Sequence, residues 1–224
     1  MERDIQRQIN AFHNPLVADP NHRYRSWEHC YRVFRSRSDA DINTLCLHLA
    51  FYLASWGMYR GSSFLLWKDY LIHKPIVKIL CDDKHAPLFR INHDDPSDDR
   101  WTVPLMLKLV ERIREAYERI DSVNCETKSV RASDTLVTKV IMGTVGCLPA
   151  YDRYVVAGMR HKGVAYSGLS STHISSLLTF YRANAEEFKK AQTRVSSPAL
   201  RYPIMKVLDM YFWSIGNELL ASGG

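Results

Sequence analysis

The 224-residue sequence has no long apolar segment and no signal-peptide-like start. Its most apolar stretch, residues 45–56, is interrupted by His48 and ends at Gly57, well short of the about 20 apolar residues that span a bilayer. The first residues, MERDIQRQINAF, carry both signs of charge and lack the apolar core of a secretion signal. We therefore expect a soluble, cytoplasmic protein without a membrane partner.

Cysteine is scarce, and the cysteines do not occur in closely spaced pairs. The five cysteines are odd in number and scattered, and none belongs to a Cys-x-x-Cys pair: Cys30, Cys46, Cys81, Cys125 and Cys147. This spacing argues against a disulfide framework and against a zinc knuckle, because both need cysteines in regular sets. The sequence instead indicates reduced thiols.

The common catalytic motifs are absent too, including the phosphate-binding loop, the dinucleotide fingerprint, His-Glu-x-x-His and Gly-x-Ser-x-Gly. A cluster in the acidic segment, His85, His93, Asp94 and Asp95, has donor types suited to a metal ion, but its spacing matches no ligand pattern. We expect a solvated loop there, with no metal ion and no other cofactor.

What the sequence does have is helical periodicity. Apolar residues recur every three to four positions, and we find neither sustained alternation nor an internal repeat. Helices are expected over residues 24–34, 42–53, 62/63–80, 104–120, 134–143, 150–160, 171–193 and 203–220. The sequence predicts an all-α protein of about eight or nine helices in one domain, residues 1–224. An alternative is that this domain consists of two lobes, residues 1–81 and 101–224, joined by a polar acidic loop over residues 82–100.

The net charge of +6 is unevenly distributed. Residues 128–206 contain twelve lysines and arginines against four acids, whereas residues 82–99 contain six aspartates against Lys84 and Arg90. A positive half of this kind attracts a phosphate polymer or an acidic surface. The candidate DNA contacts are Arg153, Arg160, Lys162, Lys189 and Lys190.

Residues 134–160 contain the strongest candidates for chemistry. Lys139 stands alone on an apolar helix, a glycine-rich hairpin follows, and Asp152 comes at the start of the next helix. Burial of a lysine disfavours its charged form and lowers its pKa, which would free an amine nucleophile. A carboxylate near a helix N-terminus stays ionised and can stabilise a sugar cation. The alternative is that Lys139 extends to solvent and Asp152 only caps a helix.

Two short elements in this segment, Thr138-Lys139-Val140 and Pro149-Ala150-Tyr151-Asp152, resemble the catalytic elements of helix-hairpin-helix DNA glycosylases of the 8-oxoguanine type. The resemblance covers residues 129–159, less than a fifth of the chain. It implies a multi-helix glycosylase-like fold, duplex DNA with a damaged or modified base as the partner, Lys139 as the catalytic lysine and Asp152 as the catalytic carboxylate.

Other residues are candidates for holding the substrate. Trp56 and Tyr59, between two glycines, could stack on an extruded base, while Arg60 could reach a phosphate. Tyr151, next to Asp152, is a further candidate. The alternative for the glycine-flanked segment is a tight turn that completes the core. Asp209, in the apolar segment VLDMYFWSIG, is a second carboxylate candidate, or else a structural partner of a lysine or arginine.

Three functions follow from these observations. The first is a DNA glycosylase that flips and excises a base, with or without strand cleavage, in repair or in antiviral defence. The second is a helical nucleic-acid-binding protein without chemistry. The third is a helical module that binds another protein through its charge asymmetry.

Overall fold

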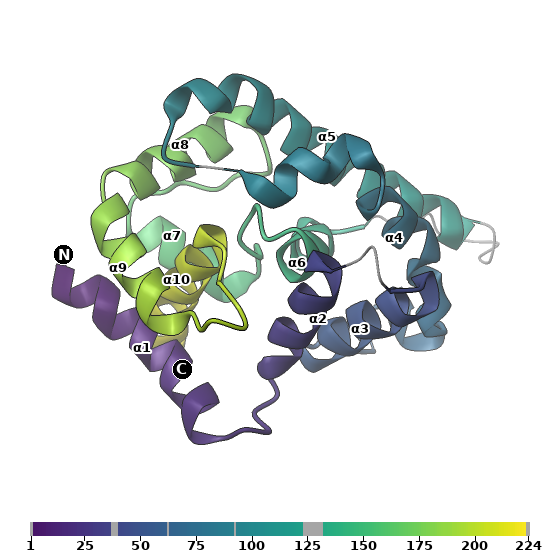
Figure 1. The fold of residues 1–224 in the computed structure, drawn as a ribbon, viewed down its shortest axis with the longest axis horizontal. Helices are drawn as coiled ribbons and strands as arrows, with labels where there is room; N and C mark the ends of the chain where they lie inside the picture. Colours follow the sequence, from purple (N-terminus) through teal and green to yellow (C-terminus); the bar gives the residue numbers. More distant parts are fainter. Residues whose placement is uncertain (1, 37–39, 62, 92, 123–131, 223–224) are drawn as a thin grey trace.

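A computed structural model of the chain describes residues 2–36, 40–61, 63–91, 93–122 and 132–222. Within these ranges the regular structure is helical and no strand occurs, so the predicted all-α class is confirmed (Figure 1). The α-helices are α1 (Glu2–Ala18), α2 (Arg25–Arg35), α3 (Ile42–Ser55), α4 (Lys74–Leu80), α5 (Asp99–Ser122), α6 (Asp134–Thr144), α7 (Arg153–His161), α8 (Ser171–Arg182), α9 (Ala185–Val195) and α10 (Ile204–Ala221). Short 3-10 helices are η2 (Phe64–Trp67), η3 (Tyr70–His73), η4 (Asp83–Arg90) and η5 (Pro96–Asp98).

The ten α-helices of the described residues exceed the expected eight or nine for two reasons. Helix α1 was not expected, although Ile5, Ile9, Phe12 and Leu16 repeat at helical spacing and are all buried. The expected helix over 171–193 is two helices, α8 and α9, which turn between Arg182 and Ala185. Both bury apolar residues in the same core, so the periodicity continues through a turn that no glycine or proline marks.

The acidic segment also differs from its prediction as a solvated loop. It contains η4 and η5, and both of its histidines are buried, His85 at 1% exposure and His93 at 7%. His85 Nδ1 lies 2.9 Å from the carbonyl oxygen of Ile79. The guanidinium of Arg182 donates to the carbonyl oxygen of His93 at 2.9 Å and forms an ion pair with Asp99 at 2.6 Å. Side-chain contacts to the helical core therefore hold a segment whose composition indicates solvent exposure.

Helix α6 lies at the centre of the molecule. Helix α5 crosses above it in Figure 1 and packs on α8, with α2, α3 and α4 on one side of α6 and α1, α9 and α10 on the other. Every residue of α6 from Leu136 to Thr144 is buried. Helix α1 packs on α9 and α10, so the two ends of the described chain lie on the same side. None of the helices in the described ranges is both long enough and apolar enough to cross a membrane.

Helices α7 and α10 are in backbone contact because each presents a glycine to the other. A Cβ added at Gly158 would lie 2.0 Å from the carbonyl oxygen of Phe212, and one at Gly216 would lie 1.9 Å from that of Tyr154. No side chain fits at either position without separating the helices. This contact fixes where the N-terminus of α7, and with it Asp152, stands relative to α10.

We expect Gly158→Ala to lower the free energy of unfolding by about 1–3 kcal/mol, the usual cost of overpacking, measured by urea denaturation. Gly61→Ala is the matched control, since no atom lies within 4 Å of its added Cβ and its backbone conformation suits alanine. A Gly158→Ala variant as stable as the control would show that α7 and α10 do not pack this closely.

Candidate active site

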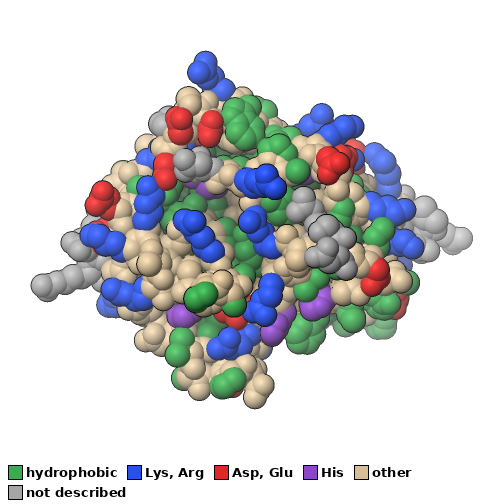
Figure 2. Space-filling model, viewed as in Figure 1, with side chains coloured by type: hydrophobic (Ala, Val, Ile, Leu, Met, Phe, Trp, Pro, Cys, Tyr) green, Lys and Arg blue, Asp and Glu red, His purple; other side chains and the backbone are tan. Residues whose placement is uncertain are grey.

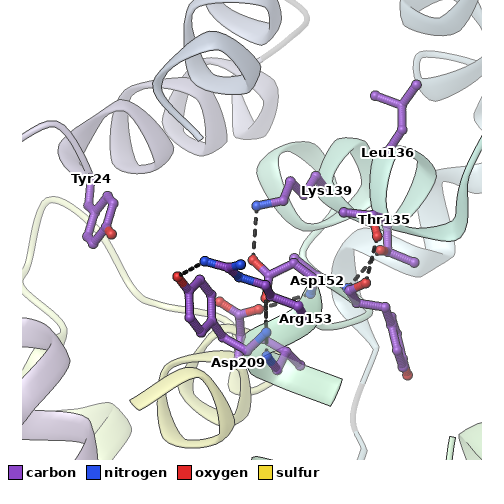
Figure 3. Close-up of polar contacts among 12 residues, drawn as sticks. Tyr24, Thr135, Leu136, Lys139, Asp152, Arg153 and Asp209 are labelled. Carbon is purple, nitrogen blue, oxygen red and sulfur yellow. Dashed lines mark hydrogen bonds and ion pairs between the residues drawn. The ribbon is translucent and has the colours of Figure 1, made fainter. Parts of the chain in front are cut away.

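The structure brings Lys139 and Asp152 together. Nζ of Lys139, on α6, lies 3.1 Å from Oδ2 of Asp152, and only 5% and 14% of the two side chains are exposed (Figure 3). The other carboxylate oxygen, Oδ1, accepts hydrogen bonds from the backbone N–H groups of Tyr154 and Val155 at 3.0 and 3.1 Å. Asp152 therefore caps α7 and also pairs with Lys139, and Lys139 is buried instead of extending to solvent.

Two threonines on α6 hold the chain that leads to Asp152. Thr138 Oγ1 accepts a hydrogen bond from the backbone N–H of Tyr151 at 2.9 Å, and Thr135 Oγ1 donates one to the carbonyl oxygen of Tyr151 at 2.9 Å. Both backbone groups of the residue before Asp152 are thus fixed to the helix that carries Lys139. The orientation of the carboxylate is set before any ligand arrives.

A second buried ion pair lies on α10. Lys206 Nζ is 2.7 Å from Asp209 Oδ2, and each side chain is 3% exposed. Asp209 Oδ1 accepts the backbone N–H of Ala150 at 2.9 Å. Asp209 thus has the partner that an acid in an apolar helix requires, and it holds the hairpin two residues before Asp152.

Trp56, at the C-terminal end of α3, contacts both lysines. Its ring lies 5.0 Å from Nζ of Lys139 and 5.0 Å from Nζ of Lys206, within the range of cation–π attraction. It stacks on the half-buried ring of Tyr24, with centroids 4.3 Å apart and planes 18° from parallel. Nε1 of Trp56 is buried and has no hydrogen-bond partner among the described residues. A buried unpaired donor is uncommon, and this one lies beside the candidate catalytic amine.

The other predicted substrate contacts lie elsewhere. The hydroxyl of Tyr59 is 2.9 Å from Nε2 of His73, and burial lowers the pKa of that imidazole to about 3. Tyr151 is 2% exposed and its hydroxyl lies 2.9 Å from Nε2 of His173, so its ring is part of the core. Arg60 is exposed on the surface. Of the four candidates, only Trp56 contacts the Lys139–Asp152 pair.

The five predicted DNA contacts differ in their surroundings. Three are in ion pairs: Lys162 with Asp4 at 2.8 Å, Lys189 with Asp94 at 2.9 Å and Lys190 with Glu187 at 2.7 Å. Arg153 and Arg160 are exposed and line a shallow groove of about 520 Å³ against the end of α10. Two further basic residues of the same half, Lys128 and Arg131, lie outside the described residues.

Sequence reasoning missed two members of the site. Lys206 precedes Asp209 by three residues, a helical pairing distance, and this spacing was the available signal. Tyr24 carries no such signal, because its stacking on Trp56 joins residues far apart in the chain. Among the described residues, no group of histidine, cysteine, aspartate or glutamate side chains is arranged to hold a metal ion.

No family model, no curated protein and no solved structure matches the chain.

We expect Asp209→Asn to lower the free energy of unfolding by about 3–5 kcal/mol, because it leaves the ammonium group of Lys206 buried without a counter-charge. The asparagine oxygen can still accept a hydrogen bond from the N–H of Ala150, so the loss of stability measures the removal of the negative charge at residue 209. Lys206→Met combined with Asp209→Asn removes both charges and should recover most of the stability in urea denaturation. Equal stability of the single and double variants would contradict this role of the pair.

Proposed function

We propose that the protein is a DNA glycosylase that excises a damaged or modified base, with Lys139 as the nucleophile and Asp152 as the stabilising carboxylate. The observation that carries the proposal is the buried contact of 3.1 Å between an amine and a carboxylate oriented by its own helix. Buried ionisable pairs are costly to the fold and occur often at functional sites. The resemblance of the two short elements to glycosylases of the 8-oxoguanine type supports the same assignment.

The reaction needs a negative charge beside a developing sugar cation. The hydrogen bonds from the backbone N–H groups of Tyr154 and Val155 hold the Asp152 side chain at the N-terminus of α7, beside Nζ of Lys139. As the glycosidic bond breaks, its electron pair leaves with the base, and the base takes a proton from Nζ of Lys139. The lone pair of that nitrogen then forms the bond to C1′ of the sugar. The C1′–O4′ bond then breaks, O4′ takes a proton from Nζ, and the electron pair freed on Nζ completes the C=N bond of a protonated Schiff base, from which strand cleavage can follow.

An extruded base needs a flat apolar surface close to this chemistry. Lys139 extends from α6 toward the side on which Tyr24 lies (Figure 3). Tyr24 and Trp56 are both half-buried, and their stacked rings are the aromatic surface next to Nζ. We assign the base to this side of the pair, with the sugar at the exposed edge of Asp152.

The test is release of free base from a panel of duplexes, each with one oxidised purine, alkylated purine or modified cytosine. Asp152→Asn keeps the helix cap but removes the charge, so we expect release to slow by about 100- to 1,000-fold while DNA binding persists. Lys139→Gln should also lose release. Asp41→Asn is the matched control, since Asp41 caps α3 in the same way and no lysine pairs with it.

Release at the wild-type rate by both site variants would refute this assignment and make Asp209 the next carboxylate to replace. Wild-type protein that binds every duplex and releases no base would instead indicate a nucleic-acid-binding protein without chemistry. Urea denaturation of each variant separates lost chemistry from lost folding, and Lys139→Gln combined with Asp152→Asn removes the unpaired charge of the single variants.

A further inference from the structure

A cleft of about 610 Å³ opens between α2, η4, α9 and the chain that leads into α10. Lysine and arginine side chains gather around a hollow in the middle of the face drawn in Figure 2. Neither Lys139 nor Asp152 lines this cleft. Its volume is in the range of ligand-binding pockets, and of the five DNA contacts predicted from the sequence only Lys189 lines it.

The charge of the cleft wall is strongly one-sided. One acid, Asp94, lines the cleft. The lysine and arginine side chains that line it are five: Arg32, Arg35, Arg90, Lys189 and Arg201. The acid forms an ion pair with Lys189 at 2.9 Å and accepts a hydrogen bond from the hydroxyl of Tyr181 at 2.6 Å. Among the described residues that line the cleft, no acid pairs with the other four, so their positive charge lies on a concave surface, where field lines are focused.

Three of the arginines are available to a ligand. Arg35 donates to the carbonyl oxygen of Phe89 and so ties α2 to η4 across the cleft. Arg32, Arg90 and Arg201 are exposed, and no hydrogen bond or ion pair joins their side chains to another described residue. One guanidinium group can donate two parallel hydrogen bonds to two phosphate oxygens. The three arginines come from separate segments of the chain and surround one opening.

Buried aromatic rings and lysines lie between the floor of the cleft and the candidate active site. Tyr31 lines the cleft and stacks on Trp27, with centroids 5.0 Å apart. Nζ of Lys206 lies 5.3 Å from the ring of Trp27 and 5.0 Å from that of Trp56, which in turn contacts Lys139. One cluster of aromatic rings and lysines thus separates the cleft from the Lys139–Asp152 pair.

We infer that this cleft binds the phosphates of one strand of the DNA substrate through Arg32, Arg90 and Arg201. The inference rests on the proposed function and deepens it, because it names the surface that holds the strand while a base is processed on the other side of the aromatic cluster. The positive charge, the arginine chemistry and the chain of contacts from Tyr31 through Trp27 to Lys206 and Trp56 favour a polyanionic strand as the occupant. A free nucleotide would use the same phosphate chemistry, and the experiment separates the two.

The experiment compares two triple variants with equal loss of charge. In one, Arg32, Arg90 and Arg201 are each replaced by glutamine; in the control, Lys74, Lys78 and Lys108, which are exposed on α4 and α5 outside the cleft, are replaced in the same way. Binding of a fluorescein-labelled duplex is measured by anisotropy over a range of salt concentrations. The cleft variant should bind more weakly, and the slope of log affinity against log salt should become shallower by about 2.7, at about 0.9 per lost phosphate contact. The control variant should keep the wild-type slope.

A cleft variant with the affinity and slope of the wild type overturns the inference. So does a cleft variant that loses only binding of inorganic phosphate or a nucleoside 5′-monophosphate, measured by calorimetry, and still binds the duplex normally. If the wild type releases no base but the cleft variant loses duplex binding, the cleft assignment stands and the proposed function fails. If the wild type releases base and the cleft variant binds the duplex with wild-type affinity, the proposed function stands and the cleft assignment fails.

Discussion

Burying two ammonium groups among aromatic rings is possible only where two carboxylates are held against them, and this constraint organises the centre of the molecule. Removing such charges from water costs several kcal/mol per ion, which a loosely placed partner does not offset. Asp152 is held by the cap of α7 and Asp209 by the N–H of Ala150. The reciprocal glycine contacts of α7 and α10 fix the two helices to one another. Caps, hairpin and helix packing therefore converge on the same two ion pairs.

Stability alone does not explain why the chain keeps these pairs. Apolar residues of similar size often serve a core as well as a buried ion pair or better, so two adjacent pairs call for another reason. An amine beside an oriented carboxylate provides one, because it supplies a nucleophile and a stabilising charge for a sugar cation. Both lysines contact the ring of Trp56, but Asp152 is 14% exposed, whereas both side chains of the Lys206 pair are 3% exposed and Asp209 supports the hairpin.

Local pattern predicted much of the fold and the main pair of the site. Helices with strong apolar periodicity, such as those around Leu109 and Leu208, lie where the sequence indicates them. Lys139 and Asp152 could be singled out because a lone lysine, a glycine hairpin and a helix cap follow in order along the chain. The turn at Ala183 escaped prediction because it interrupts no apolar period.

Contacts between distant segments could not be derived from the sequence. Tyr24 stacks on Trp56, and Arg90 and Arg201 line one cleft, only because helices far apart in the chain pack together. His93 was expected in solvent, but it is buried where Arg182 reaches its carbonyl. Composition reports the average environment of a segment, whereas the packing of other helices on it decides which side chains are enclosed.

The most direct test of the central claim is borohydride reduction of the protein on a duplex that it processes, followed by mass-spectrometric mapping of the trapped residue. Attack by Lys139 on C1′ predicts one covalent adduct, located on the peptide that contains Lys139 and absent from the Lys139→Gln variant. An adduct on Lys206 or another lysine, or rapid base release without any adduct, would contradict the claim that Lys139 is the nucleophile.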